Sequence, residues 1–191
     1  MRLSSPRIPA LADDELDDEQ RGTLDSYRDG DHGVFNIFRT LVHAPRPLRR
    51  FGFWAGYILG RHNSLPPRER ELVILRVGYL CKAGYEWAQH VVIGRDAGLS
   101  DDEIQRIKAG ADVEGWSSSD AALLRAADEL VGDHFISDAT RVALAHDAGL
   151  SDRQRMDVVF TAGQYTQVSM MLNTFGVQLD DFLVADPDLA P

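Results

Sequence analysis

Glu86 and His90 stand four residues apart within residues 84–97, whose apolar spacing predicts a helix. On a helix this spacing places both side chains on one face, close enough to hydrogen-bond, and Ile93 continues that face. A carboxylate and an imidazole therefore share an apolar surface. Burial of such a pair moves its pKa values toward the range useful for proton transfer near neutral pH. The pattern indicates acid/base chemistry. The alternatives are a solvated ion pair or a structural histidine in the core.

A second glutamate lies one predicted helix earlier. Glu71 follows Arg70 and precedes an apolar run within residues 67–81. If this helix and the next are antiparallel and joined through residues 82–84, Glu71 comes opposite His90. Two carboxylates and an imidazole could also hold a divalent metal ion, which is an alternative to acid/base chemistry. An exposed Glu71 paired with a neighbouring arginine is the structural alternative.

Arginines are concentrated between residues 39 and 76. This stretch has eight arginines against two glutamates, a local charge of +6, whereas the whole chain carries −10. Arginine binds carboxylates through two parallel hydrogen bonds, so these residues are candidate anion-binding groups. Arg76 is the preferred candidate because it follows Glu71 by about one and a half turns in an apolar helix. Ion pairs with the acidic N-terminal arm or with a neighbouring subunit would explain any one arginine equally well.

Three motifs together resemble one known family. They are RE-x-x-I-L-R from Arg70 to Arg76, Y-E-W-x-x-H from Tyr85 to His90, and Gly-Leu-Ser at residues 98–100. Over residues 36–112 these motifs resemble the carboxymuconolactone decarboxylase family, which includes the AhpD-like alkylhydroperoxidases. The resemblance implies an all-α, AhpD-like helical domain of about eight helices that forms a homotrimer or homohexamer.

The resemblance also assigns roles to the candidate residues. The peroxidase branch of the family combines a relay glutamate, a Cys-x-x-Cys pair and a histidine. Glu71 and His90 match the glutamate and the histidine, but Ala83 and Glu86 occupy the two cysteine positions. In the decarboxylase branch a glutamate four residues before the histidine is usual, as Glu86 is here. This branch implies lyase chemistry without a metal or organic cofactor, in which Glu86 and His90 exchange the proton and Glu71 orients the imidazole.

We therefore expect decarboxylation, or a related lyase or isomerase reaction, on a small-molecule carboxylate or lactone. Arg76 and Tyr85 are candidate substrate contacts. The first alternative is a peroxidase that uses the single cysteine, Cys81, because a thiolate near a helix amino terminus can be activated. The second alternative is a non-catalytic oligomeric relative.

The elements that position these residues are predicted to be helices, because apolar residues recur at spacings of three and four from Phe35 onward. The predicted helices span residues 35–43, 46–61, 67–81, 84–97, 101–109, 119–132, 138–147 and 152–174. The motif Asp-Ala-Gly-Leu-Ser-Asp occurs twice, at residues 96–101 and 147–152. Each copy places a glycine at one helix end and a serine cap at the next, with Glu103 or Gln154 completing a capping box.

The chain divides into three predicted segments. Residues 1–33 form an acidic arm expected to cover the body or a neighbouring subunit, residues 34–176 the helical domain, and residues 177–191 an acidic tail. Several helices are apolar on more than one side, which favours a homo-oligomer.

Composition sets the remaining expectations. With 191 residues, 44% of them hydrophobic, the chain can bury one sizeable core. Thirty acidic against 20 basic side chains disfavour binding to nucleic acid or to an anionic membrane surface. The most apolar run, residues 51–60, is about half the length of a helical membrane span. One cysteine permits no internal disulfide, and the first twenty residues lack a secretory pattern, so we expect a cytoplasmic protein.

Overall fold

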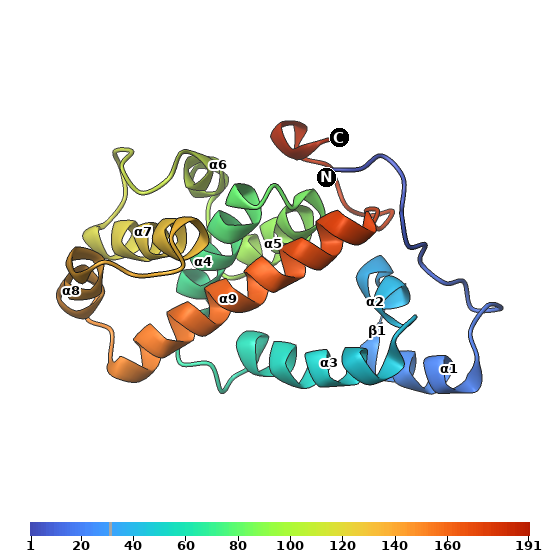
Figure 1. The fold of residues 1–191 in the computed structure, drawn as a ribbon. Coiled ribbons are helices and arrows are strands. Elements are labelled where there is room, and N and C mark those ends of the chain that lie inside the picture. The colour runs from blue at the N-terminus through green and yellow to red at the C-terminus, as the bar shows by residue number, and fades with distance from the viewer. Residues whose placement is uncertain (31) are drawn as a thin grey trace.

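The computed structural model describes residues 1–30 and 32–191, and these form an all-α fold (Figure 1). The nine α-helices of the described residues are α1 (Asp18–Leu24), α2 (Asn36–Leu41), α3 (Pro45–Leu59), α4 (Pro67–Leu80), α5 (Gly84–Asp96), α6 (Asp101–Ala109), α7 (Ser118–Gly132), α8 (Asp138–His146) and α9 (Asp152–Phe175). Two-residue strands β1 (Arg28–Asp29) and β2 (Gly33–Val34) pair antiparallel between α1 and α2. Short 3-10 turns cover Asp25–Tyr27 and Pro187–Leu189. The predicted fold class is confirmed.

The helix boundaries follow the local sequence signals. Both repeated turns form as expected: Ser100 and Ser151 cap α6 and α9 through complete capping boxes. The glycine of each motif, Gly98 or Gly149, has a positive φ of 102° or 63°, a conformation that glycine adopts without a steric penalty. All eight predicted helices are present, with ends that differ by at most two residues.

Helix α4 forms the centre of the molecule. Leu72, Val73, Ile74, Leu75 and Val77 are fully buried, although they point in different directions around the helix. Helices α5, α6, α7 and α9 pack around α4, and α9 runs diagonally across it in Figure 1. Because α4 is enclosed, the polar side chains that it carries are also removed from water, and each needs a partner within the protein.

The N-terminal arm lies along its own chain in the described residues. The backbone amides of Arg7 and Ile8 both donate to the carbonyl of Phe175 at the end of α9, at 2.8 and 3.0 Å. Past this point the arm contributes Leu16 and Leu24 to a second, smaller hydrophobic cluster. The arm therefore reaches the body of its own subunit. The boundaries of the three predicted segments stay a prediction, and residue 31 of the arm lies outside the described residues.

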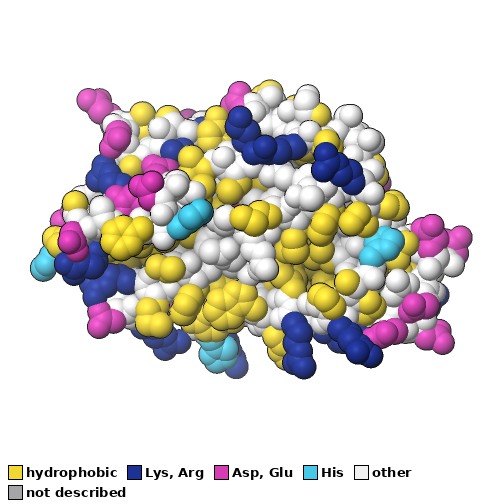
Figure 2. Space-filling model, viewed as in Figure 1, with side chains coloured by type: hydrophobic (Ala, Val, Ile, Leu, Met, Phe, Trp, Pro, Cys, Tyr) yellow, Lys and Arg dark blue, Asp and Glu magenta, His cyan; other side chains and the backbone are white. Residues whose placement is uncertain are grey.

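Large apolar side chains remain exposed on several helices, among them Trp54 on α3 and Met156 and Val159 on α9. Figure 2 shows hydrophobic side chains gathered across the middle and lower part of one face. The homo-oligomer expected from the sequence stays a prediction. In residues 1–30 and 32–191, we find no helix with the length and apolar character that a membrane crossing requires.

Gly52 on α3 is required for the position of Tyr27. The Tyr27 hydroxyl donates to the carbonyl of Leu48 at 2.8 Å, and a Cβ at residue 52 would lie 2.0 Å from that hydroxyl oxygen. We expect Gly52→Ala to lower the free energy of unfolding by about 1–3 kcal/mol, measured by urea denaturation, because the ring must move. Gly56→Ala is the matched control: a Cβ there meets nothing within 4 Å, so stability should hold or rise. Equal effects at both positions would contradict this assignment.

Candidate functional site

Glu71 of α4 and His90 of α5 form a buried hydrogen-bonded pair. The His90 Nδ1 to Glu71 Oε2 distance is 2.7 Å, and the two residues are 6% and 0% exposed. The antiparallel α4–α5 hairpin, turned at Lys82 with a φ of 54°, brings them together as the sequence predicts. With Nδ1 committed to the glutamate, Nε2 is the ring nitrogen left for chemistry, since the bond fixes the orientation of the imidazole.

Glu86 lies one helical turn before His90 and has a different environment. It is 2% exposed, and its Oε2 accepts a hydrogen bond from the Ser169 hydroxyl at 3.0 Å. Its Oε1 has no protein partner among the described residues and packs against Gly78, where an added Cβ would lie 2.9 Å away. Burial raises the pKa of Glu86 well above its ordinary value, the Glu71 charge adds to this, and the Ser169 hydrogen bond opposes it. The Glu86 carboxyl therefore keeps its proton to higher pH than an exposed glutamate does.

Tyr165 of α9 completes this group. Its ring stands edge-on to the His90 imidazole, with centroids 4.7 Å apart and an interplanar angle of 86°. Burial raises the pKa of Tyr165 well above its ordinary value, the Glu71 carboxyl acts in the same direction, and Arg70 opposes it. The phenol therefore stays neutral and can donate a hydrogen bond.

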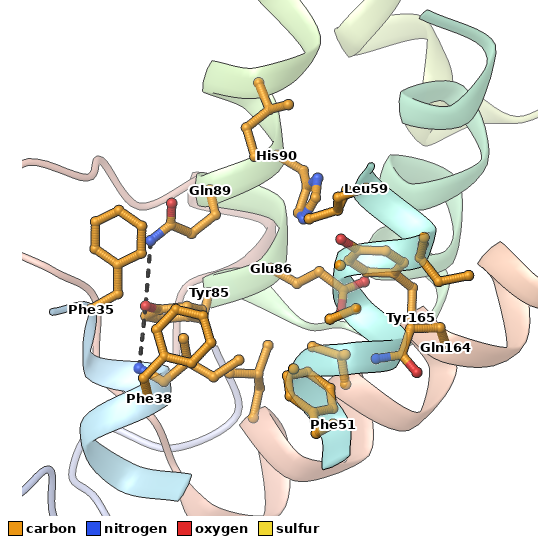
Figure 3. A pocket seen from close by; sticks show the side chains of 18 of the residues that line it. Phe35, Phe38, Phe51, Leu59, Tyr85, Glu86, Gln89, His90, Gln164 and Tyr165 are labelled. Atoms are coloured by element: carbon orange, nitrogen blue, oxygen red, sulfur yellow. Dashed lines mark hydrogen bonds between the residues drawn. The ribbon is translucent and has the colours of Figure 1, made fainter. Parts of the chain in front are cut away.

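Glu86, His90 and Tyr165 line one cavity of about 340 Å³ (Figure 3). Figure 3 shows the His90 imidazole, the Glu86 carboxyl and the Tyr165 ring directed into the same space from α5 and α9. The walls are largely apolar and aromatic, and they include Phe35, Phe38, Phe51, Ile58, Leu59 and Val168. The residues that line the cavity include no lysine and no arginine. Such a cavity suits a small, mostly apolar molecule.

Tyr85, a predicted substrate contact, lines the cavity but is held by the C-terminal tail. Its hydroxyl donates to Asp180 Oδ2 at 2.5 Å and accepts from Gln89 Nε2 at 3.3 Å. Asp180 also accepts the Asn36 backbone amide at 2.8 Å, which ties the tail to the start of α2. Burial, followed by the Asp180 charge, raises the pKa of Tyr85, so this residue forms a neutral, rigid part of the wall.

Arg76 does not line the cavity, which corrects the expectation that it binds substrate. Its Nε donates to Asp128, and its Nη1 donates to the carbonyls of Ile107 and Lys108 at 2.9 and 2.8 Å. These are carbonyls at the end of α6, which the helix itself leaves without donors. Arg76 therefore joins α4, α6 and α7, and its Nε and Nη1 donors are occupied by the protein.

Other arginines of the basic stretch pair with acidic side chains. Arg39 contacts Asp13 at 2.8 Å and Arg49 contacts Glu19 at 2.7 Å, and both acids belong to the N-terminal arm. This agrees with the alternative that the arm neutralises the arginines. Arg39 and Arg49 thus hold the arm in place, and no arginine among the described residues lines the cavity.

Cys81 lies outside the cavity. It lines a separate cleft with residues of the N-terminal arm and of α9. Burial raises the pKa of the Cys81 thiol, which reduces the fraction of reactive thiolate. The described residues also contain no group of three or more histidine, cysteine or carboxylate side chains arranged to hold a metal ion. Glu71, Glu86 and His90 therefore lack the geometry required by the metal-site alternative.

Several cavity residues were not singled out by the sequence. Tyr27 and Gln89 belong to this group, and Ser169, which bonds Glu86 from the neighbouring cleft, was not singled out either. Gln89 carried a signal, because it directly precedes His90 and stands four residues after Tyr85 on α5. Nothing in the sequence pointed to Tyr27 or Ser169, since they approach the site from distant parts of the chain.

The raised pKa of Glu86 predicts a particular pH dependence of stability. From its ordinary value of 4.5 upward, the unfolded chain releases this proton while the folded chain keeps it. Rising pH therefore disfavours the folded state until the folded pKa is passed, by about 1.4 kcal/mol per pH unit. Glu86→Gln removes this titration. We expect the free energy of unfolding of the variant, minus that of the native protein, to grow between pH 4.5 and 7 in urea titrations. A constant difference would contradict a neutral Glu86.

Comparison with known proteins agrees with the fold and with the motifs. Residues 46–129 match the carboxymuconolactone decarboxylase family. No curated protein matches the chain significantly. An uncharacterized peroxidase-related protein from Ralstonia eutropha JMP134, described as an alkylhydroperoxidase AhpD core, is 21% identical, with a TM-score of 0.79 over 92% of this chain and 93% of that one.

Two further solved structures share this fold. An uncharacterized peroxidase-related protein from Silicibacter sp. TM1040 is 18% identical, with a TM-score of 0.77 over 92% of this chain and 94% of that one. The debrominase Bmp8, as a cysteine-to-alanine variant in complex with 2,3,4-tribromopyrrole, is 11% identical, with a TM-score of 0.71 over 93% and 94%. Residues 46–129 thus match the carboxymuconolactone decarboxylase family, and the fold of the chain is similar to that of AhpD-like proteins.

Proposed function

We propose that this protein is a cofactor-free acid/base enzyme that decarboxylates a small, mostly apolar ring acid. The observation that carries the proposal is the presence, in one apolar cavity, of a buried Glu86 with a raised pKa and of a His90 oriented by Glu71. A group that holds a proton and a group that can exchange one thus face the same bound molecule. General acid/base catalysis requires this arrangement.

Decarboxylation needs a group that delocalises the developing negative charge and a source of one proton. When a carboxylate leaves as CO2, the electron pair of the broken bond stays on the substrate, where a conjugated carbonyl or ring can delocalise it. His90 Nε2 exchanges a proton with the oxygen on which the charge develops, and Glu86 then protonates the carbon. The protein supplies these groups in a cavity with little water, in which electrostatic interactions are stronger than in bulk solvent.

The cavity walls define the substrate class. The lining contains aromatic rings and no cationic side chain, which fits a molecule with one carboxylate better than a polyanion. Gln164 supplies a complementary donor: its Nε2 is buried, lines this region and has no protein partner among the described residues. A substrate carboxylate oxygen would satisfy it. The ring ligand bound by Bmp8 supports a ring substrate as well, because the two proteins share the fold.

A peroxidase reaction is less well supported. The positions that carry the paired cysteines of the peroxidase branch are Ala83 and Glu86, and Cys81 lies in the separate cleft. Glu71 and His90 therefore have no thiol beside them in the cavity.

The proposal is tested by measuring CO2 release from a panel of aromatic and unsaturated ring acids with one carboxylate, together with hydroperoxide consumption. We expect CO2 release that Cys81→Ser leaves unchanged. Peroxide consumption that disappears in Cys81→Ser would instead identify a one-cysteine peroxidase. If no acid is decarboxylated and none raises the melting temperature, the protein is a non-catalytic relative.

A further inference from the structure

A decarboxylase must load one proton from solvent in every turnover. The substrate carboxylate loses CO2 and gains a proton on carbon, so the overall reaction consumes one proton. In the proposed function this proton comes from Glu86, which must be protonated again before the next cycle. The need to reload Glu86 in each turnover rests on that proposed function.

The cavity side gives Glu86 poor access to solvent while a substrate is bound. Glu86 is 2% exposed, and the surrounding walls are apolar. Its Oε1 packs against Gly78 of the central helix α4, so the backbone of α4 blocks access of solvent from that side. The other carboxyl oxygen, Oε2, faces Ser169 of α9. The only polar neighbour that bonds the Glu86 side chain in the described part of the chain is thus the Ser169 hydroxyl.

Ser169 separates two spaces. It is 1% exposed, its Oγ lies 3.0 Å from Glu86 Oε2, and it also lines the cleft that contains Cys81. This cleft measures about 530 Å³ and shares no lining residue with the cavity. Its lining includes Arg2, Arg7, Thr166 and Asn173. A cleft with this many polar groups holds water, whereas the cavity walls do not favour it.

We propose that Ser169 is a proton relay that reloads Glu86 from this cleft, on the side of Glu86 that faces away from the substrate. After Glu86 has given its proton to the substrate carbon, the Ser169 hydroxyl passes its proton to the Glu86 carboxylate and, in the same concerted step, its oxygen takes a proton from a cleft water. That water in turn takes a proton from solvent. One proton moves from solvent to Glu86 for each CO2 released, and no other group changes its charge.

The experiment compares Ser169→Val with Ser169→Thr. Both variants add the same buried methyl group, so they share the packing cost, and only threonine keeps a hydroxyl. Thr166→Val is the matched control: its hydroxyl lines the same cleft on the same helix but donates to the carbonyl of Ala162 at 2.8 Å. Melting temperatures of all three variants confirm that they are folded.

The first readout needs no substrate. The carbonyl infrared band of protonated Glu86, identified by its loss in Glu86→Gln, shifts when its proton is replaced by deuterium in D2O. We expect at least tenfold slower exchange in Ser169→Val than in Ser169→Thr, with Thr166→Val like the native protein. The second readout is turnover, in which kcat should fall at least tenfold in Ser169→Val with KM unchanged.

The outcomes separate the relay from the proposed function. Equal exchange rates in Ser169→Val and Ser169→Thr overturn the relay, even if CO2 release is observed in the native protein. Different exchange rates without decarboxylation of any acid support the proton route and refute the proposed function. Absence of a Glu86 band at pH 7 overturns the relay as well, because no proton would be stored there.

Discussion

Glu86→Gln is expected to lower kcat for CO2 release by about 10²–10⁴-fold. Glutamine has the shape and neutral charge of the protonated glutamic acid, and its amide can still bond the Ser169 hydroxyl. It has no acidic proton to place on a substrate carbon. The folded state is therefore kept, and at pH 7 it should be at least as stable as the native protein, because the buried acid no longer has to be held neutral.

The control for this substitution is Glu69→Gln. Glu69 lies on α4, two residues before Glu71, and it does not line the cavity. Glu69→Gln is therefore the same chemical change made outside the site. Its effect on kcat should be less than twofold. The test measures kcat and KM of both variants on the acid found in the CO2 assay. Their melting temperatures show whether both variants are folded. Native-like turnover in Glu86→Gln would remove Glu86 from the reaction.

His90→Ala is expected to lower the free energy of unfolding by about 3–5 kcal/mol. The Glu71 side chain is fully buried, and its Oε1 already has no protein partner among the described residues. Removal of the imidazole takes away the hydrogen bond to Oε2 and leaves a carboxylate without any partner. Turnover should be lost as well, since Nε2 is lost with the ring.

A double variant separates the two effects of His90→Ala. In Glu71→Gln/His90→Ala the buried group is neutral, so part of the lost stability should return while turnover stays absent. His146→Ala, an exposed histidine at the end of α8, is the control and should change stability by less than about 0.5 kcal/mol. Urea denaturation at pH 7 gives all four values. A loss below 1 kcal/mol in His90→Ala would show that Glu71 is not held by this pair.

The two glutamates of the site illustrate how one residue type takes two roles. Glu71 is bonded to an imidazole, whereas Glu86 has a hydroxyl and a glycine Cα beside it. Desolvation without a cationic partner raises the pKa of Glu86. Helices α4, α5 and α9 thus place the two carboxyl groups in different surroundings within one site.

The sequence by itself determined the helices and the central pair. Apolar spacing, the two glycine–serine turns and the four-residue interval from Glu86 to His90 are local features, which act within one or two helical turns. The position of Glu71 opposite His90 also followed, because a three-residue connection leaves adjacent helices few arrangements other than an antiparallel one. That is why the central residues of the candidate site could be named in advance.

Only the tertiary structure decided what surrounds that pair. Tyr27 and Ser169 meet the site from positions far apart in the chain, and Asp180 fixes Tyr85 across 95 residues. The sequence favoured Arg76 for substrate binding, yet the ends of α6 and α7 occupy its donors. Periodicity along a helix shows which face is buried, but it does not show which distant helix covers that face. The identity of each partner is set by long-range packing, and this packing determined both the apolar character of the cavity and the raised pKa of Glu86.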